Sequence, residues 1–144
     1  MSDPRNDVRL EGIRYQAETF KIDNSTITYD STKANGSSQV GLGVTLSADD
    51  TVALVGDGEG LKGKLIKVES DNKAVVQTKG ICTLPGGTSA TLTLGEKVVG
   101  DLGGGGSDKG YIQAVATGTA AQLGHARGEI INNDDTTAVV VDLG

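Results

Sequence analysis

Apolar residues alternate with polar or small residues in short runs along most of the chain beyond residue 40. The clearest runs cover residues 40–46, 52–54, 65–68 and 75–76. A period of two residues is typical of β-strands, whose successive side chains point to opposite faces. We therefore predict strands in these runs, and further strands at residues 91–94, 97–99, 110–116, 128–131 and 137–141.

Turn-forming residues separate the runs, with Gly, Asp, Asn and Ser gathered at residues 47–50, 56–60, 70–72, 85–87 and 132–135. Turn signals every ~8–12 residues are typical of a sandwich or a barrel. Only residues 118–123 predict a short helix or turn, with Thr119 as its N-cap and Gly124 as its stop. We predict an all-β fold: a small β-barrel or β-tulip-like sandwich with an extended N-terminal arm.

Composition changes near Val40. Of the 22 glycines only Gly12 and Gly36 precede it, whereas three of the four arginines lie in the first 14 residues. We predict an N-terminal arm at residues 1–39 and a glycine-rich β-barrel body at residues 40–144. An alternative is that residues 12–20 and 25–29 form the first hairpin of the domain, so the place of residues 12–30 stays open at this point.

The arm interleaves arginines with apolar and aromatic residues, which a disordered tail would not need. Arginine and tyrosine are enriched at protein interfaces, because both give large contact areas and directional hydrogen bonds. We predict that the arm binds a partner, by strand addition or by lying across a neighbour. The candidate partner-binding residues are Arg5, Arg9, Leu10, Arg14, Tyr15 and Phe20.

Charge and cysteine content exclude several classes of protein. A net charge of −6 and a pI near 4.6 argue against nucleic-acid binding, because neutralising phosphates needs clustered Lys and Arg. Cys82 is the single cysteine and cannot form an intrachain disulfide. No apolar run approaches the ~20 residues of a membrane span. The first residues lack the apolar core of a secretory signal, so we expect synthesis in a cytoplasm.

Motifs that would carry chemistry are incomplete. The glycine run at residues 103–106 invites a phosphate loop, but Asp108 precedes Lys109 where such a loop has glycine. The acidic pairs at residues 49–50, 57/59 and 134–135 lack the alternating spacing of a calcium loop. His125, the single histidine, has no nucleophile or carboxylate motif beside it. We expect no enzyme activity, no catalytic residue, no metal site and no cofactor.

The body also resembles a known family. The runs are GLGVTL at residues 41–46, TVAL at 51–54, GLKGKLIKVE at 60–69 and AVVQTKG at 74–80, with ARGEI at 126–130 and AVVVDL at 138–143. Together they resemble the head decoration, or capsid cement, proteins of tailed bacteriophages. In that family a strand of the form G-x-L-x-x-V-E is followed by an acidic turn and a V-x-x-x-G strand. The resemblance covers roughly residues 40–144.

The resemblance implies a structural virion protein on the capsid exterior. It implies binding to the major capsid protein across subunit junctions, and self-association as a homotrimer, with a dimer as the alternative. A chain with 3% aromatic residues and no Trp can build only a thin core. This also favours self-association, because contacts between copies hide apolar surface.

Two other classes of protein remain open. A phage tail, fibre or adhesin β-module would share this composition and would form fibres instead of coating a shell. A trimeric β-rich nucleotide hydrolase is less favoured, because no Asp-Tyr-Arg run surrounds Tyr111.

Overall fold

The computed structural model describes residues 13–88, 90–102, 109–115 and 126–144. The predicted fold class is confirmed: the chain is nearly all β and contains a closed five-stranded barrel. Its elements are β1 (Gln16–Ile22), a 3-10 turn η1 (Ala34–Gly36), β2 (Gly43–Ala48), β3 (Thr51–Leu54), β4 (Gly63–Val68), β5 (Lys73–Lys79), β6 (Ile81–Leu84), β7 (Val98–Asp101), β8 (Tyr111–Ala114), β9 (Glu129–Asn132) and β10 (Val139–Asp142).

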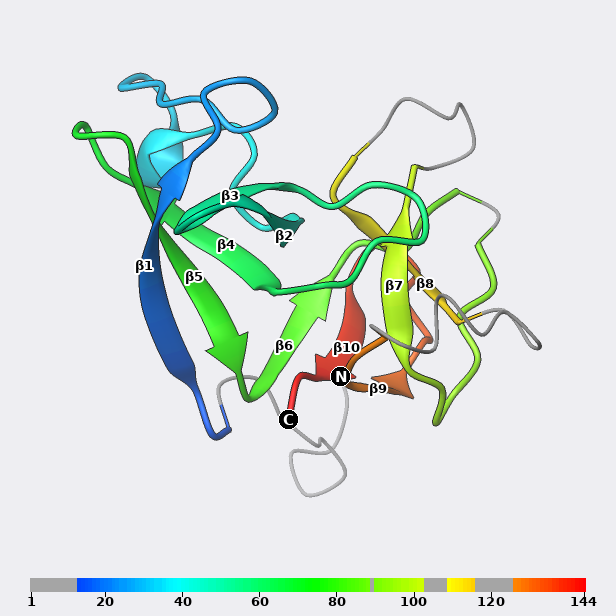
Figure 1. The fold of residues 1–144 in the computed structure, drawn as a ribbon. Coiled ribbons are helices and arrows are strands. Elements are labelled where there is room, and N and C mark those ends of the chain that lie inside the picture. The colour runs from blue at the N-terminus through cyan, green and yellow to red at the C-terminus, as the bar shows by residue number, and fades with distance from the viewer. Residues whose placement is uncertain (1–12, 89, 103–108, 116–125) are drawn as a thin grey trace.

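Strands β1 to β5 form the barrel, in the order β1-β3-β2-β4-β5 (Figure 1, left). All neighbours are antiparallel except β1 and β3, which run parallel and pair only at Lys21↔Thr51 and Ile22↔Val52. The β1–β5 ladder is much longer and extends to Gln16↔Lys79. The barrel is therefore closed at the end of β1 and open along its first part.

The C-terminal unit follows Gly80 and consists of a three-stranded sheet, β6-β10-β9, and a two-stranded sheet, β7-β8. Each part of the fold has its own hydrophobic cluster. The barrel core contains Ile22, Ile27, Val44, Val52, Leu54, Leu65, Val68, Ala74 and Val76. The C-terminal core contains Val55, Leu61, Cys82, Leu84, Leu92, Val98, Ile112, Ala114, Ile130, Val139, Val141 and Leu143.

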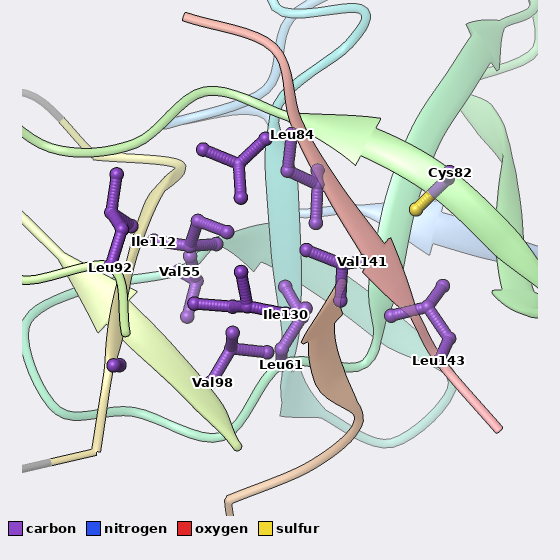
Figure 2. Packing of buried hydrophobic residues seen from close by; sticks show 12 residues of the cluster. Val55, Leu61, Cys82, Leu84, Leu92, Val98, Ile112, Ile130, Val141 and Leu143 are labelled. Atoms are coloured by element: carbon purple, nitrogen blue, oxygen red, sulfur yellow. The ribbon is translucent and has the colours of Figure 1, made fainter. Parts of the chain in front are cut away.

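The connection between β3 and β4 joins the two units. Val55 and Leu61 leave the barrel and pack beside Ile130 in the C-terminal core, as Figure 2 shows. Backbone hydrogen bonds follow the same path: Gly58 donates its N–H to the carbonyl of Gly100 at 2.9 Å, and Gly100 donates to Glu59 at 2.9 Å. Because Val55 and Leu61 of this connection complete the C-terminal core, the two units form one packed structure.

Arg127 connects three segments where the barrel meets the C-terminal unit, a contact region that we call the joint. Its Nε donates to the Leu143 carbonyl at 3.1 Å and its Nη1 to the Lys62 carbonyl at 2.6 Å, while Nη2 donates to the carbonyl of Thr78. A guanidinium has five N–H donors in a planar fork, so it can satisfy several carbonyls at once. Burial lowers the pKa of Arg127, against the opposing effect of the nearby Glu18 carboxylate.

Gly80 makes the crossing from β5 to β6 near the same joint. Its φ of +93° lies in the left-handed region, and a Cβ there would approach the Ile13 carbonyl oxygen to 2.5 Å. Its carbonyl accepts from Leu143 at 2.8 Å and its N–H donates to Gly144 at 3.2 Å. Glycine is required because φ is positive and the backbone of Ile13 and Arg14 leaves no room for a Cβ.

The sequence left open whether residues 12–30 belong to the arm or the body. β1 pairs with β5 and β3, and Ile22 and Ile27 lie in the barrel core, so residues 16–27 are part of the barrel. From Ile13 onward, where the structure describes this stretch, no hairpin forms between residues 13–20 and 25–29. The carboxylate of Asp23 instead accepts hydrogen bonds from the N–H groups of Ser25, Thr26 and Ile27 and turns the chain there.

Most predicted strands are found, but the strand predicted at residues 91–94 is wrong. That segment is irregular: Leu92 is buried in the C-terminal core, the Thr91 carbonyl accepts from Ala114 at 2.8 Å, and Leu94 is 57% exposed. The Thr-Leu alternation therefore reflects one anchoring leucine in a loop. The helix predicted at residues 118–123 lies outside the described residues.

Replacing Arg127 tests the joint. We expect Arg127→Lys to lower the free energy of unfolding by about 2–3 kcal/mol, because an ammonium cannot reach all the carbonyls that the guanidinium satisfies. Urea unfolding measures this loss. Arg14→Lys, at an exposed arginine, is the matched control and should cost less than about 1 kcal/mol. Equal effects of the two changes would contradict the assigned role of Arg127.

Asp23 gives the fold an acid-sensitive turn. Burial raises the pKa of the Asp23 carboxyl, but the hydrogen bonds from Ile27, Thr26 and Ser25 outweigh burial and hold the pKa below its usual value. The stabilisation by the Asp23 carboxylate is therefore complete above the pKa of the unfolded state, about 4. It is lost as pH falls through the lower pKa of the folded state. Asp23→Asn should lower the unfolding free energy by about 1 kcal/mol at neutral pH. The difference should shrink in acid, as denaturation at several pH values would measure.

Candidate binding surface

Half of the predicted partner-binding residues can be placed. Arg5, Arg9 and Leu10 lie outside the described residues. Arg14 and Tyr15 stand immediately before β1, and Phe20 lies within it. The structure brings the first two together and separates the third from them.

Ile13, Arg14 and Tyr15 form what we call the N-terminal corner. The Ile13 carbonyl accepts a hydrogen bond from Ile81 at 2.9 Å, and Arg14 Nη2 lies 2.5 Å from Asp142 Oδ2. These bonds fix the backbone to the start of β6 and the end of β10. The side chains of Ile13 and Tyr15 are nevertheless 45% and 50% exposed. The corner thus presents apolar and aromatic surface on an anchored backbone.

The ion pair in the corner also perturbs Asp142. The N–H of Gly144 donates to Asp142 Oδ1 at 3.0 Å, and this bond together with Arg14 holds the pKa of Asp142 below its usual value, against a smaller opposing effect of burial. Arg14 adopts a φ of +59°, which is rare for a residue other than glycine. The corner therefore depends on contacts to the C-terminal end of the chain.

Phe20 lies in a different environment. Its half-buried ring packs against the barrel core, and Lys62 Nζ stands 5.7 Å from the ring centroid. A cation at this distance from an aromatic face is attracted to it. Phe20 therefore belongs to the packing of the barrel and not to the N-terminal corner.

Sequence reasoning missed a row of lysines on the outer face of the barrel. Lys21 stands directly opposite Lys73 in the β1–β5 ladder, and Val75 separates them from Lys67 on β4. Like charges directly opposite across strands are destabilising. Asp71 lies 3.9 Å from Lys73 and is the acidic partner of this row among the described ion pairs. The alternation of residues predicts that each lysine points outward. It does not predict the strand pairing that brings the lysines together.

An open polar groove borders this row. It has a volume of about 600 Å³ and is lined by Tyr29, Ser31, Lys33, Asn35, Gly36, Lys67, Val68, Glu69 and Ser70. Its lining combines hydroxyl, amide and ammonium groups with the carboxylate of Glu69, all of which can form hydrogen bonds. The groove extends the polar surface of the barrel beyond Lys67.

The acidic pairs occupy turns. The Asp135 carboxylate accepts from the N–H and hydroxyl of Thr137, and Glu59 accepts from the Gly56 N–H at 2.8 Å. Within the described ranges, no three His, Cys, Asp or Glu side chains gather as metal ligands would. None of the described helices is long and apolar enough to cross a membrane. His125 and the glycine run at residues 103–106 lie outside the described residues.

Removing Arg14 tests the electrostatics of the corner. Arg14→Ala should raise the pKa of Asp142, because the carboxylate loses a charged donor, while the Gly144 N–H keeps part of the lowering. NMR titration of the Asp142 carboxyl measures the change. Stability should fall by less than about 1 kcal/mol, because the Arg14 side chain is mostly exposed. An unchanged Asp142 titration would contradict the ion pair.

Comparison of the chain with protein-family models, with curated proteins and with solved structures gave no match in any of the three. The function therefore has to be argued from the residues and their arrangement.

Proposed function

We propose that this protein is a structural binding module that attaches to the outside of a bacteriophage capsid and stabilises the junctions between major capsid protein subunits. The observation that carries the binding role is the N-terminal corner, where Ile13 and Tyr15 expose apolar surface from an anchored backbone. A rigid aromatic side chain loses little conformational freedom on binding, which favours affinity. The capsid as the partner follows from the sequence resemblance alone.

The architecture supports a structural role. Two cores and the Arg127 contacts hold the corner in place, and binding energy is not spent on ordering it. We propose that the protein acts without catalysis or cofactor, as a homotrimer on the capsid exterior. Leu46, 51% exposed, offers further apolar surface for contacts between copies.

The corner gives a direct test with a matched control. In co-sedimentation with assembled capsid shells, we expect Ile13→Ser/Tyr15→Ser to weaken binding at least tenfold, which corresponds to about 1.4 kcal/mol. Leu94→Ser removes an equally exposed apolar side chain from another part of the surface and should change binding less than twofold. Circular dichroism and urea unfolding check that both variants keep the β fold.

Three outcomes would count against the proposal. Shells that do not bind the wild-type protein would remove the capsid as partner. Equal effects of the two variants would remove the corner as the contact. Growth of the purified protein into long fibres would indicate a tail or adhesin module instead. A deletion in the same assay is best placed before Ile13, because Ile13 and Arg14 contact β6 and Asp142.

A further inference from the structure

One edge of β1 has no strand of the described residues beside it over most of its length. Lys21 and Asp23 donate their N–H groups toward β3, to the carbonyls of Asp50 and Val52 at 2.7 and 3.2 Å. Ile22 donates in the opposite direction, to Asn72 at the start of β5. Because backbone groups alternate in direction along a strand, Ala17 and Thr19 point to the same side as Lys21.

β3 does not extend far enough to meet them. Its pairing with β1 begins at Thr51, opposite Lys21, and the tip of the β2–β3 hairpin at Asp50 stands there. Among the described residues no strand pairs with β1 on this side before Lys21. Ala17 and Thr19 therefore present unpaired N–H and C=O groups along an exposed strand edge, which is a template for strand addition.

The charges beside this edge indicate which segment fits. Thr19 shares the outer face of the barrel with Lys21, and Lys21 lies directly opposite Lys73. A side chain on an added strand opposite Thr19 would be a diagonal neighbour of Lys21, within reach of a long side chain. An acidic residue at that position would relieve the repulsion between the two ammonium groups.

The opposite face selects apolar residues. Phe20 is half-buried and packs against the barrel core, whereas Glu18, which shares its face of β1, is exposed and its Oε1 accepts from the Thr78 hydroxyl at 3.2 Å. A residue of an added strand opposite Glu18 would lie on this same face, beside the half-buried Phe20. The matching pattern is therefore acidic and apolar in alternation.

We propose that the free edge of β1 at Ala17 and Thr19 binds an extended partner segment by strand addition, with acidic side chains toward Lys21 and Lys73 and apolar side chains toward Phe20. The inference rests on the proposed function only for the source of that segment, which would be a capsid subunit. It adds a second contact surface to the N-terminal corner, which immediately precedes β1 in the chain.

The first experiment uses the full chain, labelled with ¹⁵N, and a blocked hexapeptide in which Glu alternates with Val. We expect the amide signals of Ala17 and Thr19 to shift and their hydrogen exchange to slow at least tenfold at saturating peptide. The same peptide with Lys in place of Glu is the control and should bind at least tenfold more weakly. Unchanged exchange at Ala17 and Thr19, or equal binding of both peptides, would overturn the proposal.

Two pairs of variants separate the backbone from the charges. Thr19→Pro removes the outward N–H without removing a β1–β5 hydrogen bond, so peptide binding should be lost while Thr19→Val keeps it. Lys21→Glu/Lys73→Glu should weaken binding at least tenfold. Lys97→Glu/Lys109→Glu makes the same charge change in the C-terminal unit and should have less than a threefold effect. Retained binding in Thr19→Pro would overturn the proposal. If that variant does not fold, the exchange measurement on the wild type decides.

The shell assay distinguishes this inference from the proposed function. Loss of shell binding in Thr19→Pro, with the Thr19→Val control intact, supports both. Equal shell binding by Thr19→Pro and wild type overturns the role of the edge and leaves capsid attachment standing. Peptide binding at the edge without any binding to shells supports the edge and rejects the capsid as the source of the segment.

Discussion

The arrangement of the molecule depends on the half-buried guanidinium of Arg127. A cation withdrawn from water must find compensating acceptors, and here they are the carbonyls of Lys62, Thr78 and Leu143. These carbonyls lie before β4, within β5 and after β10, so one side chain fixes the barrel against the last strand of the C-terminal unit. The shared packing of Val55 and Leu61 adds apolar contact to the same joint. Loss of the guanidinium would leave several polar groups unsatisfied at once.

The N-terminal corner is held in place by hydrogen bonds close to this joint. Gly80 turns the chain between β5 and β6 and bonds to Leu143, the residue whose carbonyl also accepts from Arg127. Ile13 bonds to the next residue, Ile81, and Arg14 pairs with Asp142. The start of the described chain, its end and the crossing between units therefore meet in one place. An exposed residue such as Tyr15 is therefore positioned by contacts to segments far away in the sequence.

Local patterns in the sequence predicted the fold class and most strands, because alternate residues of a strand are buried on one face, as Val52 and Leu54 are in β3. The pattern failed where a buried residue anchors a loop, as Leu92 does. Pairing between distant segments leaves no local signal, so the parallel β1–β3 contact and the Lys21–Lys73 juxtaposition could not be predicted. No local pattern marks Arg127, since its acceptors are backbone carbonyls contributed by other segments.

An open strand edge usually invites self-association, and the charges on β1 explain why another copy is a poor occupant here. An antiparallel pair that joins Ala17 of one copy to Thr19 of the next would place Glu18 directly opposite Glu18, where backbones approach most closely. A foreign segment with an apolar residue at that position avoids this repulsion and can still bring acidic groups to Lys21. Glu18 therefore disfavours self-pairing, while in the proposed complex Lys21 favours an acidic residue on the added segment. In the proposed complex, salt should weaken the contacts of acidic residues with Lys21 more than the apolar contacts of the exposed Ile13 and Tyr15, because screening acts on charges alone.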